Sequence, residues 1–444
     1  MISLFPKKLS RRLGIILNGS MHAVSQVIRT IVAFVTIPII LGYLGKEAFG
    51  IWMIALSFLT LIGFFQGGVA GSLINLIAQS KNDFKDISDT LSSAISLTLI
   101  LGLIISAIST SLAFLCPWEK LFASAGIISE RDIILLILVL GCGAGFSLVS
   151  AVPKFALIGN QQAYWAHSID IIAALISAVL VISAALTKQP IWVLALAFSF
   201  GRQLPLFILG VAFLTFKIGI KKFLKFSLDP KTTRLLLGTG GLLTIIQISH
   251  ALANHADLTL IGIFNDLGGA ADYALTQKLF TLPIIGMSFV NLALWPVFAK
   301  AQSDGDTDWI MKIFRRNIII TSLLACIFAI TMGLSLNWIL KLWVGDKIHI
   351  GSLLILGMVL KTIMIVPISN MSNLLRSLDL FKFIAVLSAC MVIVNVPVSI
   401  WLIKKIGPAG AIFGTVISYA IFFAIPYLTR APKLIRETLQ NRDR

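Results

Sequence analysis

Long runs of apolar residues recur along the whole chain, and short segments between them hold most of the charged residues. Crossing the hydrocarbon core of a bilayer takes about 20 mainly apolar residues per helix. Runs of this length are typical of transmembrane helices rather than of amphipathic helices or alternating strands. The pattern predicts twelve helices, over residues 14–40, 48–77, 90–115, 133–153, 163–186, 190–216, 235–263, 272–298, 310–336, 350–373, 383–403 and 409–429.

The composition supports the same class of protein. Hydrophobic residues make up 58% of the 444 residues and charged residues only 12%, with a mean hydropathy of +0.97. A soluble globular domain carries about 25% charged residues. We therefore predict an all-α polytopic membrane protein. The first apolar run lacks the cleavage site of a signal peptide, so we expect it to be retained as a helix.

The positive charge is distributed unevenly between the predicted loops. The formal net charge of +17 alone would suggest a nucleic-acid partner. However, 24 Lys and Arg residues fall in the segments on the side of the N-terminus and only 8 on the opposite side. This asymmetry follows the positive-inside rule and predicts that both termini are cytoplasmic, with no nucleic-acid partner.

Four cations remain inside predicted helices. A charge near the bilayer centre costs at least about 2.5–3.5 kcal/mol on insertion scales, so it usually faces a bundle interior or an aqueous cavity. We interpret the four as a cationic cavity, with snorkelling at helix ends or pairing with Asp170 or Asp257 as the alternatives. The four are Arg29, Arg202, Lys278 and Lys361.

Two predicted helices also carry polar stripes at helical spacing. In the first helix the stripe comprises Asn18, His22, Ser25, Arg29 and Thr36. In the seventh it comprises Gln247, His250, Asn254 and Asp257. Intervals of three, four and seven residues place each set on one helix face. Such stripes also join helices together in membranes, but two stripes with ionisable groups favour a shared polar cavity.

The two helices are equivalent because the sequence repeats weakly. Residues 44–50 (LGKEAFG) resemble residues 267–273 (LGGAADY), and residues 157–161 resemble residues 375–379. The repeat predicts two pseudo-symmetric six-helix lobes in the same orientation, the parallel-repeat plan of transporters with a site between the lobes. The expected boundaries are 1–216 for the N-terminal lobe, 217–234 for a basic cytoplasmic linker, 235–430 for the C-terminal lobe and 431–444 for a cytoplasmic tail.

Signals for catalysis and for metal binding are missing. The four cysteines show no metal-ligand spacing, and there is no Walker A lysine motif. The predicted loops are short for a membrane glycosyltransferase or polymerase, which needs a larger extramembrane domain or clustered carboxylates. We therefore expect neither an enzyme nor a metal site.

Several short segments resemble one transporter family. Residues 41–45 (LGYLG) and 49–52 (FGIW), which follow Pro38, resemble the first hairpin of polysaccharide exporters related to O-antigen flippases of the Wzx type. Residues 294–300 (LWPVFAK) and 339–345 (ILKLWVG) are similar to later turns of that family. The family belongs to the multidrug/oligosaccharidyl-lipid/polysaccharide (MOP) superfamily, and the resemblance covers nearly the whole chain. It implies a MATE-like fold in the bacterial inner membrane.

The resemblance also implies a cargo: a polyprenyl-diphosphate-linked glycan moved between leaflets by alternating access. Arg and Lys suit its anionic headgroup. Gln66 and Asn75 occupy places where the family often has an acid and a base. Coupling to H⁺ or Na⁺ would then depend on other groups, with His22, His250, His255 and Asp257 as the candidates, and no cofactor is expected. Polysaccharide polymerase and other assembly proteins are expected partners. The alternatives are a multidrug extruder on the same fold and a non-catalytic scaffold for polysaccharide synthesis.

Overall fold

The computed structural model describes residues 11–63, 65–80, 84–118, 127–219, 223–238, 241–286, 307–346, 348–378 and 380–440. Every regular element in these ranges is a helix, and none of them contains a strand. Nine of the described helices are long and apolar enough to cross a membrane. The prediction of an all-α polytopic membrane protein is confirmed.

The other three predicted spans fall on shorter or partly described helices. They correspond to α2 (Lys46–Gly63) with α3 (Phe65–Gln79), to α10 (Gly241–Phe264), and to α11 (Leu267–Phe280) with the residues after it. The end of the span predicted over 272–298, with the motif at 294–300, lies outside the described residues.

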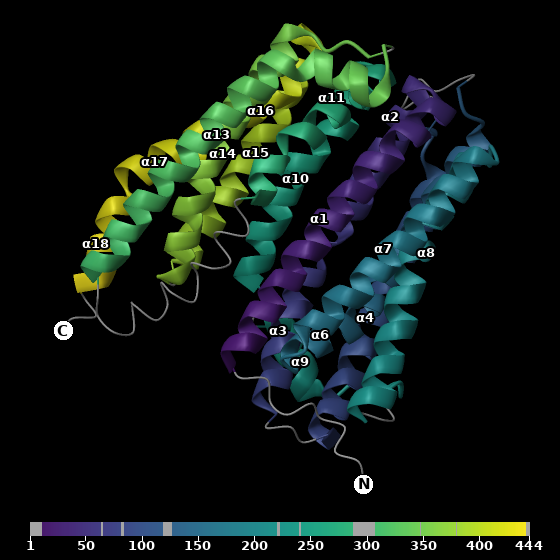
Figure 1. The fold of residues 1–444 in the computed structure, drawn as a ribbon, viewed down its shortest axis with the longest axis vertical. Helices are drawn as coiled ribbons and strands as arrows, with labels where there is room; N and C mark the ends of the chain where they lie inside the picture. Colours follow the sequence, from purple (N-terminus) through teal and green to yellow (C-terminus); the bar gives the residue numbers. More distant parts are fainter. Residues whose placement is uncertain are drawn as a thin grey trace. The chain divides into compact units, whose positions relative to one another are not determined.

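The chain divides into two compact units, Met1–Thr244 and Ile245–Arg444 (Figure 1). Besides α2 and α3, the first unit contains α1 (Arg11–Leu44), α4 (Phe84–Leu115), α6 (Glu130–Gly159), α7 (Ala163–Leu186), α8 (Ile191–Ala212), the π-helix η1 (Phe213–Ile218) and α9 (Pro230–Gly238). Within it, α7 packs against α1 and α8, and α6 packs against α4 and α8. These contacts bring the first helix beside helices that follow it by more than a hundred residues.

Close approach of α4 and α6 depends on two glycines. A Cβ on Gly102 would lie 2.5 Å from the carbonyl oxygen of Gly145, and a Cβ on Gly145 would lie 2.3 Å from that of Gly102. Because lipid is as apolar as leucine, membrane helices associate through such close backbone packing at small residues.

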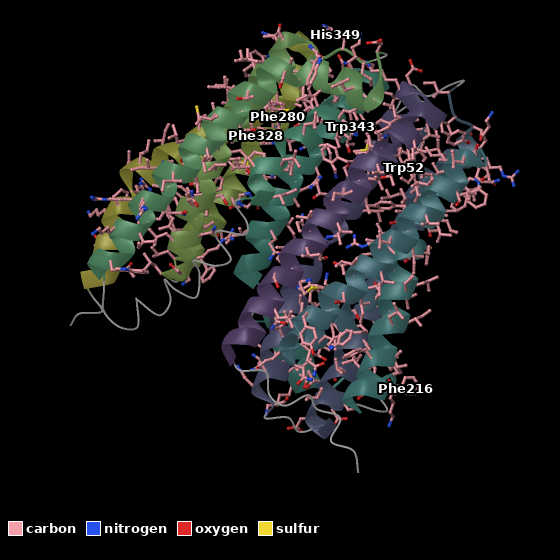
Figure 2. The ribbon with its side chains drawn as sticks, viewed as in Figure 1. Trp52, Phe216, Phe280, Phe328, Trp343 and His349 are labelled. Carbon is pink, nitrogen blue, oxygen red and sulfur yellow. The ribbon has the colours of Figure 1, made fainter. Side chains whose placement is uncertain are left out.

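The side chains of the first unit separate clearly into buried and outward-facing sets. Trp52 is 1% exposed in the interior, whereas Phe216 is 85% exposed on the outside of the unit (Figure 2). Val24, Val27 and Ile31 form an exposed apolar row on α1. Their spacing places them on a different face from His22 and Arg29, so α1 packs one face against its own unit and leaves the opposite face outside it.

The second unit contains α10 and α11, followed by α13 (Thr307–Val344), α14 (Ser352–Ser377), α15 (Phe381–Ile406), α16 (Ala409–Tyr419), the π-helix η2 (Ala420–Ala424), α17 (Ile425–Thr429) and α18 (Ala431–Gln440). Here α14 packs against α13, α16 and α11, and α15 packs against α16. A Cβ on Gly357 would lie 2.3 Å from the Ile412 side chain, so α14 and α16 also meet closely at a glycine.

The linker predicted over 217–234 is anchored to α4 of the first unit. Phe223 is buried in that unit's core, and its carbonyl oxygen accepts a hydrogen bond from Ser92 Oγ at 3.1 Å. Further along, Ser96 Oγ accepts from the Ser227 amide at 2.9 Å. Asp229 caps α9 by accepting from the Thr232 amide and hydroxyl, and these hydrogen bonds hold the pKa of Asp229 below its ordinary value. The described part of the linker is therefore ordered structure.

One predicted helix end is wrong in a way that matters for the site. The predicted span 133–153 ends at Pro153, but α6 continues to Gly159. Gly210 of α8 makes room for the proline, because a Cβ there would lie 2.7 Å from the Pro153 ring. The continuation places Lys154 inside the helix instead of in a cytoplasmic loop.

Candidate anion-binding site

The polar stripe of α1 lies against α7. Asn18 Oδ1 accepts a hydrogen bond from the Tyr164 amide at 2.9 Å. One turn on, the rings of His22 and His167 meet edge to face with centroids 4.8 Å apart. The residue numbers of the contacts increase together along α1 and α7, so the two helices run in the same direction. The stripe thus forms polar contacts between the two helices, and its members Ser25 and Arg29 reach Asp170.

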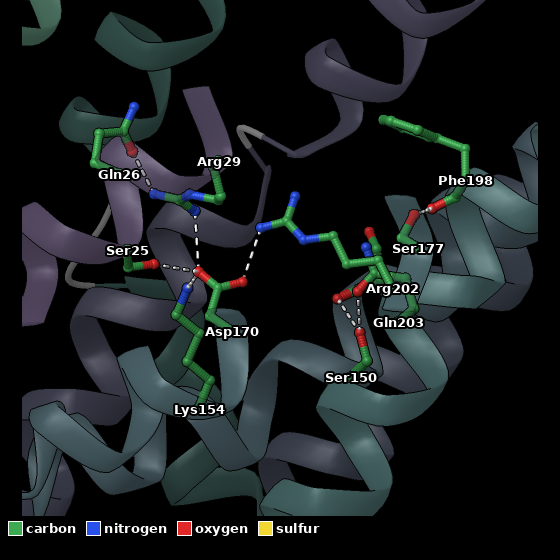
Figure 3. A network of polar contacts seen from close by, with 11 residues as sticks. Ser25, Gln26, Arg29, Ser150, Lys154, Asp170, Ser177, Phe198, Arg202 and Gln203 are labelled. Carbon is green, nitrogen blue, oxygen red and sulfur yellow. Dashed lines mark hydrogen bonds and ion pairs between the residues drawn. The ribbon is translucent and has the colours of Figure 1, made fainter. Parts of the chain in front are cut away.

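Asp170 gathers three cations from three other helices (Figure 3). Its carboxylate is fully buried, with Oδ2 at 3.0 Å from both Arg29 Nη1 and Lys154 Nζ. On the other side, Oδ1 lies 2.9 Å from Arg202 Nη2. Ser25 Oγ donates to Oδ2 at 3.5 Å. The Asp170 cluster, defined as Asp170 with Arg29, Lys154 and Arg202, therefore joins α1, α6, α7 and α8 at one carboxylate.

The cations of the Asp170 cluster retain part of their surface. The side chains of Arg29, Lys154 and Arg202 are 27%, 17% and 33% exposed. Arg29 also donates to Gln26 Oε1, whereas Arg202 Nε is buried without a partner among the described atoms. Three positive charges around one carboxylate leave an excess of two, so the cluster can still accept an anion.

Neighbouring hydrogen bonds hold the helix that carries Arg202 (Figure 3). Ser150 Oγ of α6 donates to Gln203 Oε1 at 2.6 Å. Ser177 Oγ of α7 donates to the Phe198 carbonyl at 3.1 Å. These bonds fix α8 against both α6 and α7, and so position the Arg202 guanidinium at the cluster.

A second buried acid lies in the other unit. Asp257 on α10 accepts hydrogen bonds at Oδ2 from the Tyr273 hydroxyl at 2.5 Å and from Thr415 Oγ1 at 3.1 Å. Asn395 Nδ2 donates in turn to Thr415 Oγ1 at 3.2 Å. Two buried oxygens, Asp257 Oδ1 and Asn395 Oδ1, have no hydrogen-bond partner in the part of the chain that the structure describes.

The remaining predicted residues of the second unit lie around α10. Lys361 on α14 is buried and interacts electrostatically with Asp257, while His255 interacts with both Lys361 and Lys278. His250 Nδ1 lies 3.1 Å from the Tyr419 hydroxyl. Asn254 donates to the His250 carbonyl at 2.7 Å and accepts from Gln277 at its own carbonyl at 3.1 Å, and Gln247 is half-buried.

The structure thus brings together two of the four predicted cations, Arg29 and Arg202, and adds a third that sequence reasoning missed. The predicted span ends at residue 153, which placed Lys154 in the following loop. No spacing in the sequence links Lys154 to Asp170, because they lie on two different helices, α6 and α7. Among the described residues, no group of His, Cys, Asp and Glu side chains forms a metal site.

Comparisons with known proteins agree with this fold. The chain resembles an inward-facing multidrug resistance MATE family transporter of the MOP superfamily, with a TM-score of 0.75, 16% identity and coverage of 93% of this chain and 96% of that one. It resembles the lipid II flippase MurJ in an inward closed conformation with a TM-score of 0.72 and 16% identity, over 92% of this chain and 87% of that one. The likeness confirms the predicted MATE-like fold.

Sequence comparison is more specific. A Salmonella typhi protein named "Putative O-antigen transporter" is 22% identical over 436 residues, 92% of this chain and 95% of that protein. Residues 15–302 match the polysaccharide biosynthesis protein family. Since this match covers well over half of the 444 residues, the chain belongs to the polysaccharide biosynthesis protein family.

Proposed function

We propose that the protein is a flippase that moves a polyprenyl-diphosphate-linked oligosaccharide, such as an O-antigen repeat unit, across the bacterial inner membrane. The cargo would pass from the cytoplasmic to the periplasmic leaflet, with both termini of the protein in the cytoplasm. Family membership, the name of the Salmonella relative and the MurJ-like fold support this proposal. A polymerase and other assembly proteins would act on the cargo after it has crossed.

The observation that carries the proposal is the excess positive charge of the Asp170 cluster. A polar headgroup cannot cross a bilayer unless its charges are met by opposite charges, because burial of an unpaired charge is costly. Arg29 and Arg202 can each offer two parallel N–H groups to phosphate oxygens, and Lys154 offers a point charge. A diphosphate would find both the charge and the donors it needs here.

The mechanism is alternating access, with the two units moving against each other while the lipid tail stays in the bilayer. Binding and movement suffice, because no bond of the cargo is made or broken. The protein would therefore act as a transporter and not as an enzyme.

Ion coupling would reside in the second unit. The buried Asp257 Oδ1 and Asn395 Oδ1 have no hydrogen-bond partner in the described residues, and both are acceptors. A proton or a sodium ion bound at Asp257 Oδ1 would satisfy this oxygen and neutralise the carboxylate. The change of charge would act on Lys361, which interacts electrostatically with Asp257, and through Lys361 on His255. We therefore propose coupling to H⁺ or Na⁺ at Asp257.

Deletion of the gene in its own host tests the proposed function. A flippase mutant should lose surface polysaccharide while its lipid-linked oligosaccharide accumulates. The accumulated glycan should be inaccessible to an impermeant lectin in spheroplasts and accessible after permeabilisation. A plasmid copy of the wild-type gene should reverse both effects.

The two rival functions give different outcomes of the same experiment. Loss of a scaffold for synthesis would reduce the amount of lipid-linked oligosaccharide. Loss of a multidrug extruder would leave the glycan unchanged and raise sensitivity to cationic drugs. Lectin access in intact spheroplasts of the mutant would also contradict the flippase proposal, because it would show that the cargo still crosses.

A further inference from the structure

We infer that the segment after α8 is a binding surface for acidic phospholipids of the surrounding membrane. The inference goes beyond transport and concerns a part of the first unit that is separate from the Asp170 cluster. We define the linker surface as six exposed side chains of this segment, three apolar and three basic. They are Leu224, Phe226, Leu235, Lys225, Lys231 and Arg234.

The backbone of the linker surface is held in place, so its side chains are presented in a fixed arrangement. Three serine hydroxyls of α4 bond to the backbone at residues 223, 227 and 229 over 2.9–3.3 Å, and they belong to Ser92, Ser93 and Ser96. Even so, Leu224 and Phe226 are 56% and 63% exposed. Large apolar side chains kept in water lose the stabilisation that burial would give, so their exposure on an ordered backbone indicates an apolar medium beside them.

The position of these serines along α4 places the linker surface beside the bilayer. The candidate membrane span of α4 runs from Asp86 to Leu115. At 1.5 Å per residue, Ser92 and Ser96 lie about 9 and 15 Å along the helix from the start of that span. The polar headgroup region takes up about 5–8 Å of each leaflet. The linker backbone therefore runs alongside the end of a spanning helix, near the level where headgroups meet acyl chains.

The outward-facing side of α8 leads toward the linker surface. Leu204 and Ile208, four residues apart, are exposed on one face of α8. The candidate span that includes α8 ends at Phe216, which is among the most exposed apolar side chains of the first unit. Figure 2 shows Phe216 at the end of this unit where Figure 1 places α9. The apolar surface of the span is thus continued by the apolar members of the linker surface.

Basic side chains are interspersed with the apolar ones. Lys225 stands between the two exposed apolar residues of the linker. On α9, Leu236 is buried in the core of the first unit. Lys231, Arg234 and Leu235 follow one another at helical spacing on the exposed face of the same helix. Long basic side chains can place their apolar stems among acyl chains and their charges among headgroups, so this mixture suits a membrane interface.

Charge selects the class of lipid. Residues 217–234 contain six Lys or Arg residues and a single acid, Asp229, which caps α9 through Thr232. Groups of four to eight Lys or Arg residues next to a membrane helix attract anionic lipids. A phospholipid with a net negative charge therefore fits the linker surface better than a zwitterionic phospholipid, which offers the same acyl chains without the charge.

Quenching by brominated lipids tests the inference at the surface itself. Phe226→Cys, in a background without the four native cysteines, is labelled with a bimane fluorophore and placed in nanodiscs. The nanodiscs contain equal amounts of phosphatidylglycerol and phosphatidylcholine, and either one or the other carries brominated acyl chains. Quenching should show that phosphatidylglycerol is enriched beside the label at least about fivefold, the ratio that one basic residue supplies near a charged membrane.

Removal of charge and a second reporter provide the controls. Lys225→Gln/Lys231→Gln/Arg234→Gln should reduce the enrichment to below about twofold, because the attraction depends on these charges. High salt should have the same effect on the linker that keeps its three cations, since salt screens exposed charge. A bimane label at the exposed Leu103, near the middle of α4, should be quenched equally by both lipids. Size-exclusion profiles and melting temperatures establish that each protein is folded.

Three results would overturn the inference, and each leaves the flippase proposal standing. Equal quenching at position 226 by the two lipids would show no selection for acidic lipid. Absence of quenching at position 226, with normal quenching at position 103, would show that water or a protein covers the linker surface. Enrichment that persists in the folded triple variant or in high salt would show that charge plays no part. The salt measurement decides this point even if the triple variant does not fold.

Discussion

Sharing one carboxylate among three cations makes the members of the Asp170 cluster unequal. Loss of one cation leaves Asp170 with two others, so no buried acid is stranded. Loss of the acid leaves three cations facing one another. Breaking a buried pair by removing one partner costs about 3–5 kcal/mol when the other is left uncompensated. Substitution of Asp170 should therefore lower the stability of the protein by this amount, whereas substitution of one of its partners should lower it less.

We expect Arg29→Ala to reach the membrane in near-normal amounts and yet fail to restore surface polysaccharide to a flippase-deficient strain. Its loss of stability should be about 1.5 kcal/mol, the low end for hydrogen bonds to charged groups, because Lys154 and Arg202 still hold Asp170. Arg29→Lys should recover part of the activity, since the charge survives without the bidentate fork.

Asp170→Ala provides the contrast and should reduce abundance strongly. Immunoblots of membranes, thermal unfolding in detergent and surface polysaccharide together measure all three variants. Wild-type polysaccharide from a well-expressed Arg29→Ala protein would remove this residue from the site. Equal abundance of Asp170→Ala and the wild type would show that the cluster does not stabilise the fold.

Sequence patterns reveal the individual residues of the site but not their pairing. Arg29 and Arg202 stand out because charge in an apolar run is rare. Asp170 belongs to the same class and was recognised only as a possible partner. That all three meet depends on which helices pack together, and hydrophobic periodicity carries no information about that choice. Lys154 was missed because the predicted span ends at residue 153, one residue before it, whereas α6 continues to Gly159.

Among the elements, the linker between the units has contacts that its composition does not predict. The basic composition of residues 217–234 suggested a tether. In the structure, Phe223 enters the core of the first unit, and serines one turn apart on α4 bond to the linker backbone. Long apolar runs identify the spans well because a helix in lipid must be apolar. A surface segment held by side-chain hydrogen bonds has no recurring pattern of apolar residues.

We expect removal of the α4 anchors to loosen the linker without disturbing the helices. In Ser92→Ala/Ser96→Ala, trypsin should cleave at Lys225 several-fold faster than in the wild type, and stability should fall by about 1 kcal/mol per lost bond. Cleavage is followed by mass spectrometry on the solubilised protein. Thr98→Val is the matched control, since the Thr98 hydroxyl donates to the Ala94 and Ile95 carbonyls of its own helix. Identical cleavage rates in the three proteins would show that the serines do not secure the linker.

At the scale of the whole molecule, hydropathy and charge asymmetry predicted the fold class because both report on the bilayer directly. Apolar length determines where a helix can span, and this is independent of which helices later become neighbours. The direction of insertion follows from Lys and Arg in the loops, and it remains a prediction. It can be tested without any assumption about packing.

Single cysteines at Ser227 and Ser124, in a background without the four native cysteines, provide that test. An impermeant thiol reagent added to intact spheroplasts should label position 124 and spare position 227. Permeabilisation should expose position 227, which serves as the control for reactivity. The opposite labelling pattern would invert the topology and place the basic linker outside the cell.

The separation of 141 positions between Arg29 and Asp170 has a consequence for biosynthesis. Helices enter the membrane in chain order, and synthesis proceeds at about 5–20 residues per second, so α1 precedes its acidic partner by about 7–28 s. During that interval Arg29 is an unmatched charge at a cost of at least about 2.5–3.5 kcal/mol in lipid. Newly synthesised α1 should therefore remain next to the insertion machinery until α7 has been inserted. Pairing of Arg29 with Asp170 would then be an early step in the assembly of the first unit.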